Sequence, residues 1–321
     1  MPKVSVVIPN YNHARFLARR IESILQQSFQ DLEIIILDDD SNDGSREIIS
    51  DYKKKCPQIR TYFNDQNSKS AFKQWDLGVQ KSLGEYLWIA ESDDYAEKEF
   101  LADTVSVLEK NPGVGIVYCE SKIVDEFDNI LSEVSHQKPF LSPHWDKWKK
   151  NYINQGKKEL ASCLYLNNTI NNASSVLFRK NIYLEAGQAD QSMIFCGDWY
   201  LYIRMLMISD VAYIARVHNN LRVHSGSTRF RYFDNEIYFK ELMRIYAFLG
   251  KTMKLDNKQR KEMSGLFSGL LLRKLFRRFS ISRKLYREIK RFDPYFEFHA
   301  IDYFAKKIWD RGKERLERVV A

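Results

Sequence analysis

The chain has 321 residues, of which 44% are hydrophobic and 14% aromatic, so it can form one large core and an additional segment. Glycine and proline are scarce, at 13 and 7 residues, which excludes a largely disordered or fibrous protein. The four cysteines lie far apart, so neither a zinc site of paired cysteines nor a disulfide framework is expected.

The first half of the chain alternates apolar strands with amphipathic helices. Strands are predicted at residues 4–8, 33–37, 59–63 and 86–89, and helices at 13–27, 45–55, 71–83 and 97–110. This repetition predicts a doubly wound, Rossmann-like α/β domain with a mainly parallel sheet. Further along, strands are predicted at 114–119, 174–179 and 211–215, a helix at 198–208, and loops at 135–155 and 219–227. After residue 230 the pattern is helical, so we divide the chain into residues 1–230 and a helical appendage, 231–321.

Apolar stretches are short throughout. The stretch at residues 4–8 is too short for the apolar part of a signal peptide, and none approaches the roughly 20 residues of a membrane-spanning helix. We therefore expect a cytoplasmic protein, either soluble or peripheral at the inner face of the plasma membrane.

The net charge of +8 lies at the end of the sequence. Segment 273–321 carries 15 Lys and Arg against 7 Asp and Glu, which accounts for the whole excess. Its interleaved aromatic residues fit an amphipathic hairpin on an anionic membrane, or a cap that packs on the rest of the protein or on a second subunit. No nucleic-acid motif accompanies the charge, so nucleic acid is not an expected partner.

Polar clusters follow three of the predicted strands. They are 9–12 (Pro-Asn-Tyr-Asn), 38–45 (Asp-Asp-Asp-Ser-Asn-Asp-Gly-Ser) and 91–94 (Glu-Ser-Asp-Asp). Ligands of doubly wound sheets bind at the carboxyl ends of the strands, so these clusters mark the expected site. Cluster 38–45 crowds carboxylates that repel one another unless donors or a cation neutralise them, although its second half also fits a turn that caps the next helix.

Cluster 91–94 brings three carboxylates to the end of a buried strand. Mn²⁺ and Mg²⁺ prefer carboxylates combined with phosphate oxygens, and such a cation can neutralise a diphosphate leaving group. The alternative is a solvated acidic turn that caps the following helix. Together with cluster 38–45, the pattern favours a divalent metal site.

These clusters, followed by 196–204 (Cys-Gly-Asp-Trp-Tyr-Leu-Tyr-Ile-Arg), resemble family 2 glycosyltransferases with the GT-A fold over about residues 3–230. The resemblance implies a metal-assisted, inverting glycosyltransferase, moving a hexosyl or N-acetylhexosaminyl group. The implied donor is a nucleotide-diphosphate sugar, and we expect a UDP-sugar. The implied acceptor is a hydroxyl of a glycan or a lipid-linked sugar, and the C-terminal helices are expected to contact membrane or form a homo-oligomer.

The resemblance also assigns residues on the donor side. Pro9, Tyr11 and Asn12 would lie against the nucleotide, while Asp38 and Asp39 would bind its uracil or ribose. A second group of residues would hold the metal and the donor diphosphate. This group is Glu91, Asp93, Asp94 and His224. A lone histidine such as His224 also fits a purely structural role.

On the acceptor side, Asp198 matches the catalytic base, whose carboxylate takes the proton of the attacking hydroxyl. It also fits an N-cap of the helix that follows. Asn172, Ser174 and Trp199 correspond to the acceptor side of the family.

The sequence departs from the family pattern in three places. Glu91 replaces the commoner aspartate, Asp40 stands where glycine is usual, and segment 187–190 lacks the usual aromatic and second acid. Two other functions were weighed. A nucleotidyltransferase needs a glycine-rich loop after the first strand, and 9–12 contains no glycine. A non-catalytic nucleotide-sugar-binding subunit would not need Asp198.

Overall fold

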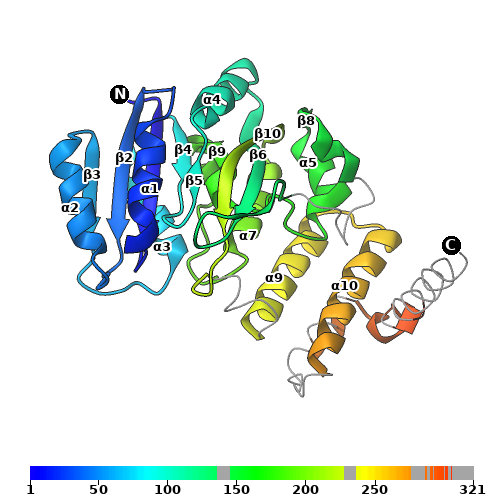
Figure 1. Ribbon diagram of the computed structural model, residues 1–321. Coiled ribbons are helices and arrows are strands. Elements are labelled where there is room, and N and C mark those ends of the chain that lie inside the picture. The colour runs from blue at the N-terminus through cyan, green and yellow to red at the C-terminus, as the bar shows by residue number, and fades with distance from the viewer. Residues whose placement is uncertain are drawn as a thin grey trace, which may run out of the picture. The chain divides into compact units, whose positions relative to one another are not determined.

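The computed structural model describes residues 1–135, 145–227, 236–275, 286–287, 290–291, 293–299, 301–302 and 305. The chain divides into two compact units, Met1–Arg231 and Tyr232–Ala321. Figure 1 labels the helices and strands of each unit in chain order. The two units are described separately below.

A ten-stranded sheet forms the N-terminal unit. Its order is β3-β2-β1-β4-β9-β6-β10-β5, with β7 paired to β6 and β8 paired to β10. The strands are β1 (Val4–Asn10), β2 (Leu32–Asp38), β3 (Ile59–Phe63), β4 (Tyr86–Ile89), β5 (Tyr95–Ala96), β6 (Val114–Val124), β7 (Ile130–Ser132), β8 (Tyr152–Asn154), β9 (Val176–Arg179) and β10 (Asp210–Arg222). Strands β3, β2, β1 and β4 are mutually parallel, as predicted. Because β9 runs antiparallel to both β4 and β6, the second half of the sheet is mixed.

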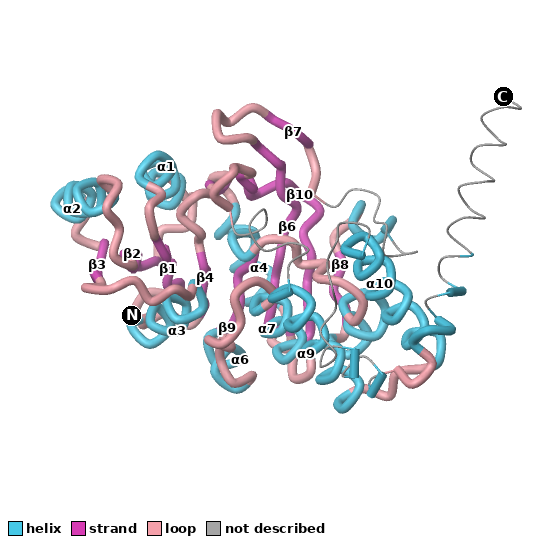
Figure 2. Tube along the Cα trace, turned by 90° about the horizontal axis from the view of Figure 1, so that it is seen from below, coloured by secondary structure: helices cyan, strands magenta, loops and turns pink. Residues whose placement is uncertain are grey.

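Helices cover both faces of this sheet, as Figure 2 shows for α1 and α2 on one side and α3 on the other. They are α1 (Ala14–Leu25), α2 (Ser45–Lys55), α3 (Ala71–Lys81), α4 (Phe100–Lys110), α5 (Gly156–Glu159), α6 (Lys180–Glu185) and α7 (Gly197–Leu206). Alternate residues of β1 serve the two faces, since Val4, Val6 and Ile8 join the core under α1 and α4, whereas Val7 meets α3. The predicted α/β fold is therefore confirmed.

Strand β10 is longer than the predicted strand at 211–215 and takes up part of the predicted loop 219–227. It runs parallel to β6, and its pairing register shifts between Ile214 and Val217 and again between Val217 and Asn219, as at a β-bulge. His218, Asn219 and Asn220 are buried in it. Polar residues inside a strand conceal it from hydrophobic periodicity, which explains why the sequence underestimates its length.

The C-terminal unit contains α9 (Glu236–Thr252) and α10 (Asn257–Leu275). Phe239, Phe267 and Phe296 form a row of ring contacts inside it, with centroid distances of 5.5 and 6.3 Å. Most of the basic segment 273–321 lies outside the described residues, so its predicted contact with a membrane or a second subunit stays a prediction. Among the described helices, none combines the length and apolar character required to cross a bilayer.

Helix α3 approaches β1 so closely that a side chain at Gly78 has no room. An added Cβ would lie 2.2 Å from Val7 Cγ1, and Val7 is fully buried. We predict that Gly78→Ala lowers the free energy of unfolding by about 2 kcal/mol through overpacking. Gly113→Ala is the control, because its nearest atom would be 3.4 Å away. Urea denaturation measures both, and equal stabilities would contradict the packing described here.

Candidate active site

The loops that follow β1, β2 and β4 meet at one edge of the sheet. Asn10 and Asp38 are direct neighbours in the parallel pairing of β1 with β2, and β4 lies on the other side of β1. The predicted polar clusters 9–12, 38–45 and 91–94 are thus brought to the same edge, as the topology of a doubly wound sheet requires.

The Asp38 carboxylate organises the first two loops from below. It is 1% exposed and accepts hydrogen bonds from Asn10 Nδ2 at 2.9 Å, from the Ser41 amide at 3.0 Å and from Arg46 Nε at 2.9 Å. Asn12 joins the same loops, because its amide donates to Ser41 Oγ and its side chain accepts from the Asn42 amide. Asp38 therefore fixes the positions of the loops that follow β1 and β2.

Asp39 is also occupied by protein donors. Its carboxylate accepts from Asn64 Nδ2 at 2.6 Å, from Gln74 Nε2 at 2.9 Å, and from the amide and hydroxyl of Ser68 at 2.9 and 2.8 Å. In contrast, Tyr11 is half exposed, and Pro9 is buried. The hydrogen bonds of Asp38 and Asp39 hold the loops 9–12, 38–45 and 64–68 in place. Tyr11 has the exposed side chain in this part of the site.

The acidic loop 91–94 is largely buried. Burial raises the pKa of the Glu91 carboxyl to about 8, and the neighbouring Asp93 charge acts in the same direction. Trp75 Nε1 donates to Glu91 Oε1 at 2.9 Å, and the Glu91 amide donates to Ser174 Oγ at 3.1 Å. Glu91 is held against α3 and the segment before β9.

Asp94 points into the protein. Its side chain is 3% exposed, Oδ1 accepts from the Arg222 amide at 2.8 Å, and Oδ2 accepts from Asn172 Nδ2 at 3.0 Å. Burial, reinforced by the charge of Asp93, raises the pKa of Asp94 to about 6. Because both oxygens accept hydrogen bonds from protein groups, Asp94 joins the acidic loop to β10 and to the segment before β9.

Arg20 supplies the buried opposite charge. Its side chain is 0% exposed, Nε donates to the Glu91 carbonyl at 2.8 Å, and one terminal nitrogen lies 3.9 Å from Asp94 Oδ2. Burial lowers the pKa of Arg20 to about 10, although the charges of Asp94 and Asp93 oppose that shift. The two terminal nitrogens make no hydrogen bond within the described residues, so their stabilisation comes from the carboxylates around them.

Arg222 connects the acidic loop to the loop between β6 and β7. Its Nε donates to the Asp93 carbonyl at 2.7 Å, Nη1 donates to the Asp125 carbonyl at 2.9 Å, and Nη2 lies 2.6 Å from Asp128 Oδ1. The guanidinium also lies over the Phe16 ring, 4.7 Å from its centroid. The end of β10 is thereby fixed beside the acidic loop, and His224 follows two residues later.

Three potential metal ligands gather at this point. One atom each from His13, Asp93 and His224 lies within 4.8 Å of the others, and His224 Nε2 is 3.1 Å from Asp93 Oδ2. Burial acts to raise the pKa of Asp93, but the hydrogen bond from His224 and the nearby charge of His13 hold it below the ordinary value. Asp93 is therefore the carboxylate of the loop that ionises most readily, and it has two imidazoles beside it.

Asp198 lies in the first turn of α7, where the helix dipole favours a negative charge. Its carboxylate accepts from the Trp199 amide at 2.6 Å and from Asn168 Nδ2 at 3.1 Å. The charges of Asp198 and Glu91 both contribute, after burial, to raising the pKa of Tyr202. Both carboxylates therefore act electrostatically on the same buried phenol.

The residues predicted for the acceptor side, Asn172, Ser174 and Trp199, all have buried side chains. Asn172 and Ser174 are buried and support Asp94 and the Glu91 amide. Trp199 is also buried, and its Nε1 donates to the Leu164 carbonyl at 2.9 Å. The contacts described for these three side chains are with protein groups, and their assignment to the acceptor side stays a prediction.

Sequence reasoning did not identify His13 or Arg20. Both lie on a segment whose pattern predicted only an amphipathic helix, and their partners are 79 and 71 residues further along the chain. The sequence signal that could have identified Arg20 is its position next to Ile21, on the face of the helix that is otherwise apolar. A buried arginine requires a partner, and the acidic loop was the obvious candidate.

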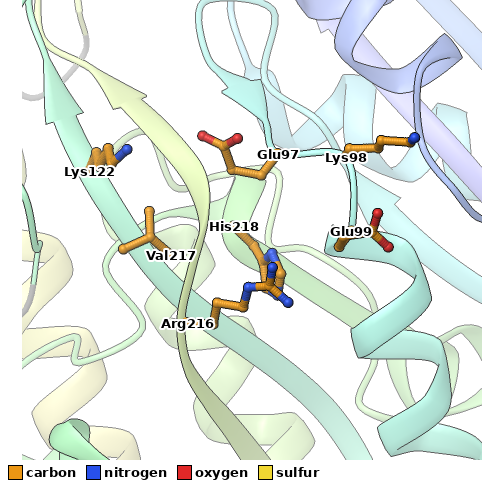
Figure 3. Close-up of a pocket in the computed structure, with 7 residues that line it drawn as sticks. All are labelled: Glu97, Lys98, Glu99, Lys122, Arg216, Val217 and His218. Carbon is orange, nitrogen blue, oxygen red and sulfur yellow. The ribbon is translucent and has the colours of Figure 1, made fainter.

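A separate cavity of about 350 Å³ lies beside β5, β10 and the start of α4 (Figure 3). It is lined by Glu97, Lys98, Glu99, Lys122, Arg216, Val217 and His218. No predicted site residue lines it, so it is distinct from the acidic loop.

Comparison with known proteins identifies the class. The model of the glycosyl transferase family 2 matches residues 5–184, so the chain belongs to that family. An uncharacterized glycosyltransferase of Nostoc sp. is 35% identical over 142 residues, covering 44% of this chain and 43% of the relative. The GalNAc(5)-diNAcBac-PP-undecaprenol beta-1,3-glucosyltransferase of Campylobacter jejuni is 29% identical, covering 41% and 42%. The match thus spans less than half the length of these two relatives.

Solved structures of the same fold extend over nearly the whole chain. S. aureus TarS 1–349 in complex with UDP-GlcNAc has a TM-score of 0.68 at 14% identity, covering 97% of this chain and 92% of the TarS 1–349 chain. The mannosyltransferase PcManGT of Pyrobaculum calidifontis, in complex with GDP-Man and Mn²⁺, has a TM-score of 0.57 at 14% identity, covering 96% and 88%. These likenesses confirm the predicted GT-A fold.

The buried position of Arg20 leads to a stability prediction. Arg20→Met should lower the free energy of unfolding by about 3 kcal/mol, because it leaves the buried acidic loop without its internal cation. Arg19→Met is the control, since Arg19 is half exposed and its pair with Asp128 is worth less than about 1 kcal/mol. Urea denaturation compares the two. A loss at position 20 no greater than at position 19 would contradict this role.

Proposed function

We propose that the chain transfers a sugar from a UDP-sugar to a hydroxyl of a glycan or lipid-linked acceptor, with inversion at the anomeric carbon. The observation that carries this proposal is the meeting of two features at one sheet edge. They are the ligand cluster of His13, Asp93 and His224, and the carboxylate of Asp198 in the first turn of α7. Helix α3 links the two, because Phe72 packs against Gly197 at the start of α7 and Trp75 donates to Glu91 in the acidic loop. A glycosyl transfer from a nucleotide sugar needs both leaving-group stabilisation and a base.

For the donor, we propose that the nucleotide lies along the loops 9–12 and 38–45. Tyr11 offers the accessible aromatic surface there, and Asp38 and Asp39 hold the two loops in shape from below. The TarS structures that share this fold were solved with UDP and UDP-GlcNAc, which supports UDP as the nucleotide. The sugar itself is not specified by these residues.

For the metal, the residues fit a divalent cation. Asp93 and His224 would hold it, because a carboxylate oxygen and an imidazole nitrogen lie side by side, 3.1 Å apart, next to a third potential ligand. The Mn²⁺ in the PcManGT complex supports this assignment. When bound, such a cation neutralises the charge that develops on a diphosphate leaving group. Glu91 and Asp94 contribute by fixing the loop that carries Asp93.

For the base, we propose that Asp198 accepts the proton of the acceptor hydroxyl as that oxygen attacks the anomeric carbon from the side opposite the diphosphate. Trp199 and Asn168 orient the carboxylate by donating hydrogen bonds to it. The name of the Campylobacter jejuni relative includes an undecaprenol acceptor, which supports a lipid-linked or glycan acceptor for this chain.

Ligand binding can be tested by thermal shift on the full chain. UDP with Mn²⁺ should raise the melting temperature more than UDP alone, since a ligand that binds only the folded state stabilises it. GDP, CDP and ADP serve as controls for the base. Asp93→Ala should remove the Mn²⁺-dependent part of the shift and keep the rest. A UDP shift that is independent of Mn²⁺ in both proteins would exclude the metal from donor binding.

The base can be tested with Asp198→Asn, which removes proton-accepting capacity at nearly constant shape. We expect turnover of the donor sugar to fall by about 10²- to 10⁴-fold, with donor affinity nearly unchanged. Asp190→Asn is the matched control, because Asp190 lies in the same segment and makes local bonds to Ser192. Normal turnover in folded Asp198→Asn protein would show that another group acts as the base.

A further inference from the structure

We propose that His13 is a direct ligand of the divalent cation, so that the ion is held by two imidazoles and one carboxylate and the site prefers a transition-metal ion to Mg²⁺. This inference rests on the proposed function, because it concerns the cation assigned there to Asp93 and His224. It adds the residue that directly precedes α1, at a position where the sequence predicted only the start of an amphipathic helix.

The spacing of the three side chains fits one ion. His224 Nε2 and Asp93 Oδ2 are 3.1 Å apart, and two ligands at right angles about 2.1 Å from an ion lie about 3 Å apart. One atom of His13 lies within 4.8 Å of one atom from each of the other two residues. A hydrogen bond between His224 and Asp93 alone would not require a second imidazole at this position.

His13 also has the outer partner that a metal-binding imidazole requires. Its Nδ1 lies 2.8 Å from Ser92 Oγ, and Ser92 is 1% exposed within the acidic loop. When Nδ1–H donates to this hydroxyl, Nε2 keeps its lone pair for an ion. The same loop therefore presents Asp93 as a ligand and orients His13 through Ser92.

Aromatic packing holds both imidazoles in place. The rings of His13 and His224 meet edge to face with centroids 5.5 Å apart, and Phe16 lies 5.0 Å from His224 and 6.1 Å from His13. Rings fixed in this way need little reorganisation to bind an ion.

The composition of the ligand set determines which ions fit. Imidazole nitrogen suits transition-metal ions such as Fe²⁺, Ni²⁺ and Zn²⁺, and Mn²⁺ belongs to the same series while also suiting carboxylate oxygen, whereas Mg²⁺ prefers oxygen ligands and keeps several waters. A site of carboxylates alone would accept Mg²⁺ readily. The group predicted from the sequence already contained one imidazole, that of His224, and His13 adds the second. The observed set with two imidazoles therefore favours the transition-metal ion.

Mn²⁺ binding to the full chain tests the inference without any turnover. Mn²⁺ is titrated in the absence of nucleotide, and free Mn²⁺ is measured by electron paramagnetic resonance. The unmodified chain should bind one ion that an excess of Mg²⁺ of about tenfold does not displace. His13→Phe keeps the aromatic packing and removes the ligand, so affinity should fall by about tenfold or more. Glu126→Gln is the control, because it removes a nearby charge that pairs with Arg15 and leaves all three ligands.

A spectroscopic measurement covers the case in which a variant fails to fold. Electron spin echo modulation of bound Mn²⁺ in the unmodified chain should contain the nitrogen couplings of two imidazoles. One imidazole, no binding, or displacement by Mg²⁺ would overturn the inference. Unchanged Mn²⁺ affinity in His13→Phe with binding lost in Asp93→Ala would also overturn it, while leaving the proposed function intact. Binding retained in both variants would remove the metal from the proposed function as well.

Discussion

Burial of opposite charges at one edge of the sheet is the constraint on which the rest of the site depends. Asp94 and Arg20 are enclosed by protein, and neither would be tolerated there without the other charges and donors around them. Arg222 completes the arrangement by bonding to backbone atoms on two loops. The hydrogen bond from His224 and the nearby charge of His13 keep the pKa of Asp93 low, so this carboxylate stays ionised beside the two imidazoles.

The first half of the fold could be predicted from the sequence, and the second half only in part. Strands β1 to β4 are dominated by apolar residues, and helices α2 and α3 begin where the pattern predicts them. Strand β10 was underestimated because His218, Asn219 and Asn220 are buried within it and find polar partners such as Asp103 and Ser121. The short strands β5 and β8 depend on pairing with the distant strand β10, which local propensity does not encode.

The candidate site, like the fold, could be predicted from the sequence only in part. Crowded carboxylates at strand ends are visible in sequence, and so Asp93 and Asp198 could be named, although their roles are proposals that await the tests above. The direction in which each carboxylate points is not visible, and Asp38, Asp39 and Asp94 turn out to be engaged by protein donors. His13 was missed because its significance comes from Ser92 and His224, which only the folded sheet brings near.

The placement of β10 has a consequence for the order in which the site is assembled. Asp93 and His224 are separated by 131 residues, and β10 enters the sheet between β6 and β5, after every other strand has been synthesised. The loops 9–12 and 38–45 can form once β1 and β2 have paired. The ligand cluster of His13, Asp93 and His224 forms only after β10 has entered the sheet. Contacts between segments so far apart in the sequence form slowly during folding. Ion binding at this cluster would therefore indicate that the N-terminal unit has finished folding.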